Sequence, residues 1–266
     1  MAIKDRITNI IDSIKASTEK KDAMKPIGPN RNTFTWNESI NPSGKIAVYT
    51  CLYGSYDKLH EPEYISDKID YIVFTDEKIK KHSKWIKKDI PYKYIYDLDK
   101  KRLARYAKLL PHKVLPEYEY SIYVDANIIV KGDITKYIKS LTDYPVAMSW
   151  HPLRRCLYKE GLAFYIMKKI TKREFRKQMR IYREEGMPED FGLTDNNVIV
   201  RKHKDKRCIK LMETWWEDYN RFGKRDQLCF PYSVWRSGLT MDTLGHFPVN
   251  SRFMPEIKIV THRGRY

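Results

Sequence analysis

Residues 120–127 read Tyr-Ser-Ile-Tyr-Val-Asp-Ala-Asn, an apolar run that leads directly into two oxygen-bearing side chains. A run of this kind is typical of a buried strand. Asp125 at its end and Asn127 two positions later point to the same side of the strand terminus, and paired oxygen ligands suit Mg²⁺ or Mn²⁺. A simple turn is the alternative, because Asp and Asn both favour turns. A carboxylate on so apolar a strand needs a partner, however, since burying it alone costs folding energy.

Further apolar runs on both sides of this stretch predict a layered α/β fold. The runs at 46–51 and 69–74 have the pattern of buried strands that end in polar loops. Helical periodicity marks residues 99–115, with an interruption at Pro111. Downstream we expect strands near 145–150 and 197–200 and helices over about 160–184, 205–221 and 225–237. Strands separated by helices imply a sheet whose ligands bind at the carboxyl ends of the strands.

The first 44 residues differ in composition from the rest of the chain. Residues 1–25 carry isoleucines at helical spacing, whereas residues 26–44 have the Pro, Gly and Ser content of a linker. The amphipathic helix is too short to be a domain. We expect the apolar face of this helix to dock on the main body or to pair with a second copy, which would make a homo-oligomer. The alternative is that the helix lies on a membrane surface. Residues 45–266 are expected to form one domain.

Composition sets limits on the class of protein. The chain has 266 residues and a formal net charge of +17, which favours an anionic partner. Its 42% hydrophobic content excludes wholesale disorder. No apolar run reaches the roughly 18 residues of a membrane span, and charged residues interrupt the N-terminus, so we expect neither a span nor a signal peptide. The cysteines stand far apart in apolar surroundings, which predicts buried free thiols and a cytoplasmic location; they are Cys51, Cys156, Cys208 and Cys229.

Basic side chains on two predicted helices are candidates for contact with that anionic partner. Arg102, Arg105 and Lys108 recur at i, i+3 and i+6 ahead of the central strand, a spacing suited to holding a diphosphate. Residues 164–183 carry eight Lys and Arg side chains against the single Glu174. This segment predicts peripheral contact with an anionic acceptor at the inner face of the membrane. For both helices the alternative is a solvated basic face.

Three polar side chains mark the ends of the first two strands. Thr50 and Tyr53 lie near the carboxyl end of the first strand, and Asp76 closes the second. Nucleotides bind at this edge in sheets of this kind. We expect Tyr53 to stack on the base and Asp76 to accept a hydrogen bond from the base or the ribose.

Several of these stretches together resemble one family. Residues 45–57, 104–108, 123–127 and 226–227 are similar to a glycosyltransferase-like family that includes plant mucilage-related transferases and proteins of bacterial polysaccharide loci. The similarity covers about residues 45–240. More distantly, the layout resembles the family 8 galactosyltransferases of the GT-A fold, which carry a D-x-D motif, a late D-Q pair and a C-terminal histidine that binds metal.

The resemblance implies a metal site. Asp125 and Asn127 match the D-x-D motif, and the resemblance implies His262 as the third ligand of Mn²⁺ or Mg²⁺. Asn127 departs from the motif, because a neutral amide binds a cation more weakly than a carboxylate does. Metal dependence is therefore expected to be looser than in the family 8 enzymes.

The resemblance also implies contacts to the donor sugar. Asp226 and Gln227 match the D-Q pair, and Asn196 matches loosely the polar turn that contacts the sugar. If the reaction retains configuration, Asp226 or Gln227 lies below the sugar ring to stabilise its positive charge. If it inverts, Asp195 or Asp226 acts as the base. The sequence leaves both open.

The residues and the resemblance together predict a GT-A-like glycosyltransferase, with a Rossmann-like mixed sheet flanked by helices. It would be a metal-dependent hexosyltransferase that moves a sugar from a nucleotide-diphosphate sugar, above all a UDP-sugar, to a glycan or lipid-linked acceptor in surface polysaccharide synthesis. One alternative is an RNA-binding protein without enzymatic activity, although no RNP, KH or helix-turn-helix signature supports it and we expect no nucleic acid partner. A catalytically idle GT-A scaffold is the other, because of Asn127.

Overall fold

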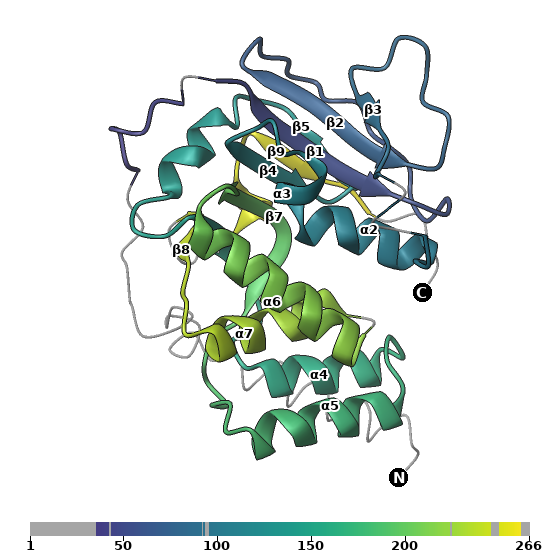
Figure 1. Cartoon of the computed structure of the whole chain (residues 1–266), viewed down its shortest axis with the longest axis vertical. Helices are drawn as coiled ribbons and strands as arrows, with labels where there is room; N and C mark the ends of the chain where they lie inside the picture. The colour runs from purple at the N-terminus through teal and green to yellow at the C-terminus, as the bar shows by residue number, and fades with distance from the viewer. Residues whose placement is uncertain are drawn as a thin grey trace.

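The computed structural model describes residues 36–261, apart from 43, 92, 94, 95, 224 and 246–249. Its centre is a seven-stranded sheet in the order β3-β2-β1-β4-β7-β6-β8, and a small sheet of β5 and β9 accompanies it (Figure 1). The strands are β1 (Ile46–Leu52), β2 (Ile69–Thr75), β3 (Ile86–Lys88), β4 (Tyr120–Val124), β5 (Ile128–Val130), β6 (Val146–Trp150), β7 (Thr194–Lys202), β8 (Asp242–Thr243) and β9 (Ile257–Ile259). The helices are α2 (Lys100–Leu109), α3 (Pro111–Val114), η3 (Thr135–Ser140), α4 (Leu157–Ile166), α5 (Lys172–Glu184), α6 (Lys206–Phe222), α7 (Asp226–Ser237) and η4 (Ser251–Phe253).

The Rossmann-like mixed sheet predicted from the sequence is confirmed. β1, β2, β3 and β4 run parallel, whereas β7 lies antiparallel between β4 and β6. β1 and β4 are apolar along most of their length because the sheet is covered on both faces. The carboxyl ends of β1 and β4 and the amino end of β7 therefore meet at one edge of the sheet.

Two apolar clusters cover the two faces of the sheet. One packs α2, α3, α6 and α7 against Tyr49 and its neighbours, with Trp215 fully buried in it. The other packs η3 and the β5–β9 sheet against Val48 and its neighbours. Val48 and Tyr49 belong to different clusters because successive side chains of a strand point to opposite faces. A third cluster joins α4 and α5 to α7, at the bottom of the view in Figure 1.

The single helix predicted over residues 160–184 is wrong, because the structure forms α4 and α5 instead. Lys168 adopts a left-handed backbone with φ +56°, which ends the first helix. Thr171 then begins α5 with a capping box: its hydroxyl accepts from the backbone N–H of Glu174, and the Glu174 carboxylate accepts from the backbone N–H of Thr171. Neither Pro nor Gly marks the break between Met167 and Thr171, but Thr171-x-x-Glu174 has the capping-box pattern, which is the signal in the sequence that a new helix begins there.

The other predicted elements have close counterparts. The interruption at Pro111 separates α2 from α3, and the strand expected at 197–200 extends over Thr194–Lys202. The four cysteines are buried and free, as predicted. Within the described residues, no helix combines the length and apolar character needed to cross a bilayer.

The N-terminal region is described only from residue 36. Trp36 and Ile40, inside the predicted linker, pack against the cluster that contains Val48. The helix and homo-oligomer contact predicted for residues 1–25 lie outside the described residues, and the domain boundary at residue 44 stays a prediction.

Candidate functional site

A cleft of about 740 Å³ opens where β1 and β4 end and β7 begins. The loop after β1, one face of α2, the segment after β4 and the start of α7 contribute to its walls. Basic side chains outnumber acidic ones among its lining residues. The basic ones are Lys100, Lys101, Arg105, Lys108, Lys169, Arg225 and Arg252, and the acidic ones are Asp57, Asp125, Asp195 and Asp226. This excess of positive charge suits an anionic ligand.

Lys108 lies at the centre of the charged groups in this cleft. Its ammonium is 2.9 Å from Asp226 Oδ2 and 3.3 Å from Asp125 Oδ1, and its side chain is only 4% exposed. One turn earlier on α2, Arg105 places Nε 3.2 Å from Asp226 Oδ1. Three separate elements, α2, the end of β4 and the start of α7, thus bring two cations and two carboxylates together. These four side chains, which were predicted separately from the sequence, lie together in one cluster.

Burial and nearby charges shift the pKa values of Asp226 and Tyr123. Burial alone would raise the pKa of Asp226, but Arg105 and Lys108 outweigh it and hold that pKa well below 3.8. Burial, with the nearby Asp125 carboxylate, raises the pKa of Tyr123 well above its usual value. The Tyr123 hydroxyl therefore stays protonated and donates to Asp125 Oδ1 at 2.8 Å. Because its pKa is lowered, Asp226 is an anion at every physiological pH and a weak base.

The backbone of α2 explains why its cations face the cleft. Asp99 caps the helix by accepting from the backbone N–H of Arg102 at 2.8 Å. Positions three residues apart then share a face, which places Arg105 and Lys108 together. Arg102, the first member of the predicted stripe, is not among the residues that line the cleft.

Asp125 and Asn127, the predicted metal ligands, both line the cleft. The Asn127 amide donates through Nδ2 to the Val260 carbonyl at 2.8 Å, and the Val260 backbone N–H donates to the Asn127 carbonyl at 2.9 Å. This pairing turns the amide oxygen of Asn127 away from the Val260 carbonyl. His262, two residues beyond Val260, lies outside the described residues. Within them, no group of three or more His, Cys, Asp or Glu side chains forms a metal cluster.

The side chains predicted to face the donor sugar also line the cleft. Asp195 accepts from Arg252 Nη1 at 2.5 Å. Asn196 accepts from the Thr194 hydroxyl at 2.6 Å, while its Nδ2 is buried without a hydrogen-bond partner among the described residues. Gln227 donates through Nε2 to the Thr194 carbonyl at 3.0 Å. The Asp195 carboxylate is thus held by a guanidinium, and the two amides are anchored to the start of β7.

The three predicted nucleotide contacts separate into two kinds. Tyr53 lines the cleft, whereas Thr50 is 1% exposed inside β1 and does not. Asp76 lies behind the loop: its carboxylate accepts from the backbone N–H of Gly54 at 3.0 Å and pairs with Lys100 at 3.0 Å. Gly54 needs its lack of a side chain here, since its φ is +79°. Asp76 therefore shapes the loop, and Tyr53 is the side chain that reaches the cleft.

Four basic residues of the cleft were not predicted, namely Lys100, Lys101, Arg225 and Arg252, whereas Lys169 belongs to the basic segment 164–183. Lys169 and Arg225 lie 5.6 Å and 5.2 Å from the ring centroid of Phe164. Arg225 directly precedes Asp226, which is the one signal that the sequence offers for it. Arg252 meets its partner across 57 residues of chain, so no local pattern points to it.

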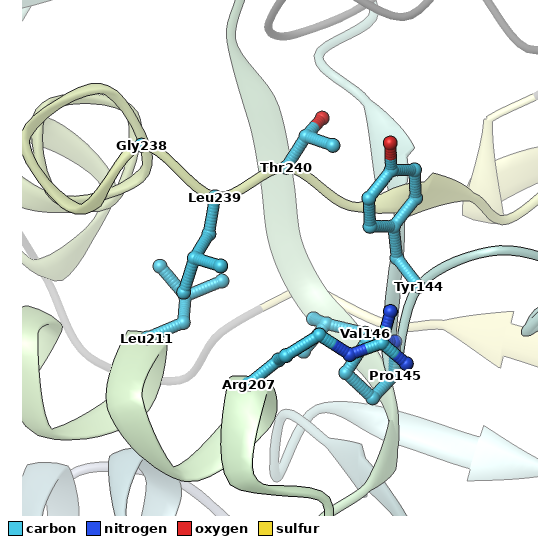
Figure 2. Close-up of a pocket in the computed structure, with 8 residues that line it drawn as sticks. All are labelled: Tyr144, Pro145, Val146, Arg207, Leu211, Gly238, Leu239 and Thr240. Atoms are coloured by element: carbon cyan, nitrogen blue, oxygen red, sulfur yellow. The ribbon is translucent and has the colours of Figure 1, made fainter.

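A second, smaller pocket lies at the opposite end of β6. It measures about 150 Å³ and shares no lining residue with the cleft. Figure 2 shows Arg207 and Leu211 of α6 facing Tyr144, Val146 and Leu239 across it. Its volume is below the roughly 300 Å³ at which ligand sites begin, so it does not compete with the cleft as a nucleotide site.

Comparison with known proteins identifies the family. The family model described as "TOD1/MUCI70, glycosyltransferase-like domain" matches residues 32–252. The chain belongs to this family. The resemblance expected from the sequence is confirmed, and with the seven-stranded mixed sheet the match confirms the GT-A-like fold class.

One curated relative and several solved structures are similar to the chain. "Probable hexosyltransferase MUCI70" of Arabidopsis thaliana is 23% identical over 240 residues, which are 76% of this chain and 40% of that protein. The S. cerevisiae mannosyltransferase Ktr4p in complex with GDP is 11% identical, with 96% of this chain and 91% of that one covered and a TM-score of 0.46. The galactosyltransferase LgtC, solved with donor and acceptor sugar analogs, is 12% identical. The match covers 74% of this chain and 72% of that one, with a TM-score of 0.42. TM-scores of this size say nothing about the donor or acceptor of this chain.

Proposed function

We propose that the chain is a hexosyltransferase that uses a nucleotide-diphosphate sugar, above all a UDP-sugar, and a glycan or lipid-linked acceptor in surface polysaccharide synthesis. The observation that carries this proposal is the buried Lys108 ammonium between Asp125 and Asp226, on the floor of a cleft with excess basic side chains. The cleft volume of about 740 Å³ lies in the range of small-molecule sites. Family membership supports a transferase over an RNA-binding protein.

The residues present fit a divalent cation beside the diphosphate. Mg²⁺ is usually held by one or two protein oxygens together with substrate phosphates and water. Asp125 offers a carboxylate, and Asn127 offers an amide oxygen that its bond to Val260 leaves turned away from that carbonyl. When bound, Mn²⁺ or Mg²⁺ would neutralise charge on the departing diphosphate. His262 remains the proposed third ligand.

The chain's own side chains supply the rest of the chemistry. We assign Arg105, with 23% of its side chain exposed, to contact with the diphosphate, and Lys108 adds positive charge beside it. Asp226 is a weak base, and we assign it the electrostatic role of stabilising positive charge that develops on the sugar ring. Gln227 and Asn196 orient the sugar hydroxyls. Asp195 becomes the base only if the acceptor releases it from Arg252.

A screen of nucleotide-sugars tests this proposal. We expect slow hydrolysis of a UDP-hexose, stimulated by Mn²⁺, and a rise in melting temperature with UDP and Mn²⁺. Stabilisation by RNA and not by UDP would support the RNA-binding alternative. Binding of UDP without turnover on any hexose would support the idle scaffold.

The exposed face of α5 supports a proposal about the acceptor. Lys172, Arg173, Arg176 and Lys177 are all exposed on it. The adjoining α4 contributes Phe164 to the cleft wall, so the basic face lies on a helix pair next to the site. We assign this face to an anionic lipid or lipid-linked acceptor at the inner surface of the membrane, with a cytoplasmic location for the chain. Residues 1–25 remain the proposed contact to a second copy.

A further inference from the structure

A fully buried guanidinium lies beneath the cleft, where an apolar side chain would be expected. Arg201 on β7 is 0% exposed and sits at the face of the sheet covered by α2 and α6. Among the described residues, no carboxylate forms an ion pair with it, and its Nε has no hydrogen-bond partner. Burying a charge without a carboxylate is costly, so the hydrogen bonds that the guanidinium does make have to offset that cost.

Two of the three hydrogen bonds of Arg201 lead to the backbone of Lys108, and the third joins Nη1 to Met212 Sδ at 3.3 Å. Nη1 donates to the Lys108 carbonyl at 2.9 Å, and Nη2 donates to the Tyr49 hydroxyl at 2.5 Å. The Tyr49 hydroxyl in turn donates to the same Lys108 carbonyl at 3.1 Å. Two side chains from two strands, β7 and β1, therefore hold one carbonyl in the last turn of α2.

The position along α2 gives this contact a physical reason. The last carbonyls of a helix lack intrahelical partners and carry the negative end of the helix dipole. A guanidinium placed there satisfies one of these carbonyls and is stabilised by the dipole. The same residue sends its ammonium into the cluster with Asp125 and Asp226. Holding the Lys108 carbonyl in place thus also fixes the position of the Lys108 Cα atom, from which the side chain extends into the cluster.

We propose that Arg201 and Tyr49 are positioning residues that hold Lys108 in place between Asp125 and Asp226. This inference rests on the proposed function insofar as Lys108 serves donor binding. Neither residue lines the cleft, so both act on the ligand indirectly. Tyr49 also packs against Tyr123, with ring centroids 5.3 Å apart, a contact that Tyr49→Phe keeps. A guanidinium suits this role because its planar fork reaches both the carbonyl and the hydroxyl, which a single ammonium cannot do in the same geometry.

The test compares Arg201→Lys and Tyr49→Phe with the control Val200→Ala. Arg201→Lys keeps the charge and loses the fork, and Tyr49→Phe removes one hydroxyl. Val200 neighbours Arg201 on β7 but faces the opposite cluster, so its truncation destabilises the sheet without touching Lys108. We expect the Kd for UDP, measured well below every melting temperature, to rise about tenfold in Arg201→Lys and about threefold in Tyr49→Phe. In Val200→Ala it should stay within about twofold of the parent value.

A crystal structure of each variant gives a readout that needs no nucleotide. In Arg201→Lys, or in Tyr49→Phe if the first does not fold, the Lys108 ammonium should leave Asp226, whereas Val200→Ala should keep their 2.9 Å separation. An unmoved Lys108 with unchanged UDP affinity would overturn the positioning role. If the parent chain does not bind UDP, the proposed function fails, and the position of Lys108 in these structures still decides this inference by itself.

Discussion

α2 and α5 carry similar basic stripes in sequence and have opposite environments in the structure. On α2, Lys108 is 3% exposed and lies between two carboxylates. On α5, Lys172 and Arg176 face solvent, and the pair formed by Arg180 with Glu184 at 3.8 Å joins two exposed side chains. The spacing of cations therefore does not reveal their role. What packs over the helix decides it.

The two environments also differ in how strongly their charges interact. Charges in a buried cluster interact across a low effective dielectric and are weakly screened by salt. Exposed charges are solvated, and each pair contributes about 0–1 kcal/mol. Substitutions in the α2 cluster should therefore change folding and chemistry together, whereas substitutions on α5 should change binding to the membrane or to the acceptor and leave the fold intact.

Lys108→Met should have the largest effect. It leaves Asp226 with Arg105 as its one remaining cation in the cluster, and breaking a buried pair costs about 3–5 kcal/mol. We expect that loss in the free energy of unfolding in urea, together with loss of sugar transfer. Arg102→Met on the same helix is the matched control and should change stability by about 0.5 kcal/mol or less. Equal effects of the two substitutions would contradict the distinction between the buried Lys108 in the cluster and the half-buried Arg102 outside the cleft.

Asp125→Ala should abolish transfer while the fold persists. The carboxylate is 31% exposed at the cleft, so its removal costs less stability than the loss of Lys108. Asn127→Asp is the companion variant: it restores a second carboxylate and should retain activity or tighten Mn²⁺ binding. Turnover by Asp125→Ala at the parent rate, measured with a UDP-hexose, would show that this carboxylate is not part of the site.

Stability should fall with acid in two steps. Burial lowers the pKa of His203 to about 4 and that of His151 to about 3, from 6.5. Below pH 6.5 the unfolded chain takes up protons that the folded chain does not, so stability decreases as pH falls towards these values. The lowered pKa of Asp226 adds a further loss below about pH 4, since the unfolded carboxyl protonates first.

Urea unfolding between pH 7 and pH 3 measures these steps. His203→Gln should flatten the upper part of the profile, and Asp226→Asn the part below pH 4. Identical slopes in the parent chain and in both variants would show that these buried groups do not control the acid limb.

Reversal of charge on α5 should have the smallest effect on the fold. Changing Lys172, Arg173, Arg176 and Lys177 to Glu should leave stability within about 1 kcal/mol, because the side chains are exposed. It should abolish binding to vesicles rich in anionic lipid, which in the parent chain should also weaken as salt rises. Hydrolysis of the UDP-sugar should not change. If the variant binds such vesicles and transfers sugar to a lipid-linked acceptor as the parent does, α5 is a solvated surface.

The sequence predicts the parts of the site that depend on local pattern. Asp125 and Asn127 stand out because they end an apolar run, whereas Asp226 and Gln227 are assigned to the site through the resemblance to the D-Q pair. Arg201 could not be found in this way, since it belongs to the basic run Arg201-Lys202-His203-Lys204, which reads as the solvated end of a strand. Its partner is a backbone carbonyl, which leaves no trace in residue identity.

Two further features depend on tertiary contact. The break between α4 and α5 occurs at Lys168 without Gly or Pro; the capping box of Thr171 and Glu174 marks the new helix in the sequence, and the packing of both helices on α7 stabilises the turn between them. Arg252 reaches Asp195 from a segment that has no periodicity of its own. Local propensity therefore predicts the sheet and most helices, whereas the pairing of Arg252 with Asp195 in the cleft depends on how segments distant in sequence pack together.

A crystal structure with UDP and Mn²⁺ tests the central claim most directly. The account predicts the diphosphate between the cationic face of α2 and the pair Asp125 and Asn127, with uracil beside Tyr53. The Lys108 ammonium should stay within 4 Å of Asp226. Uracil and diphosphate bound outside this cleft, or an empty cleft at saturating UDP, would contradict it.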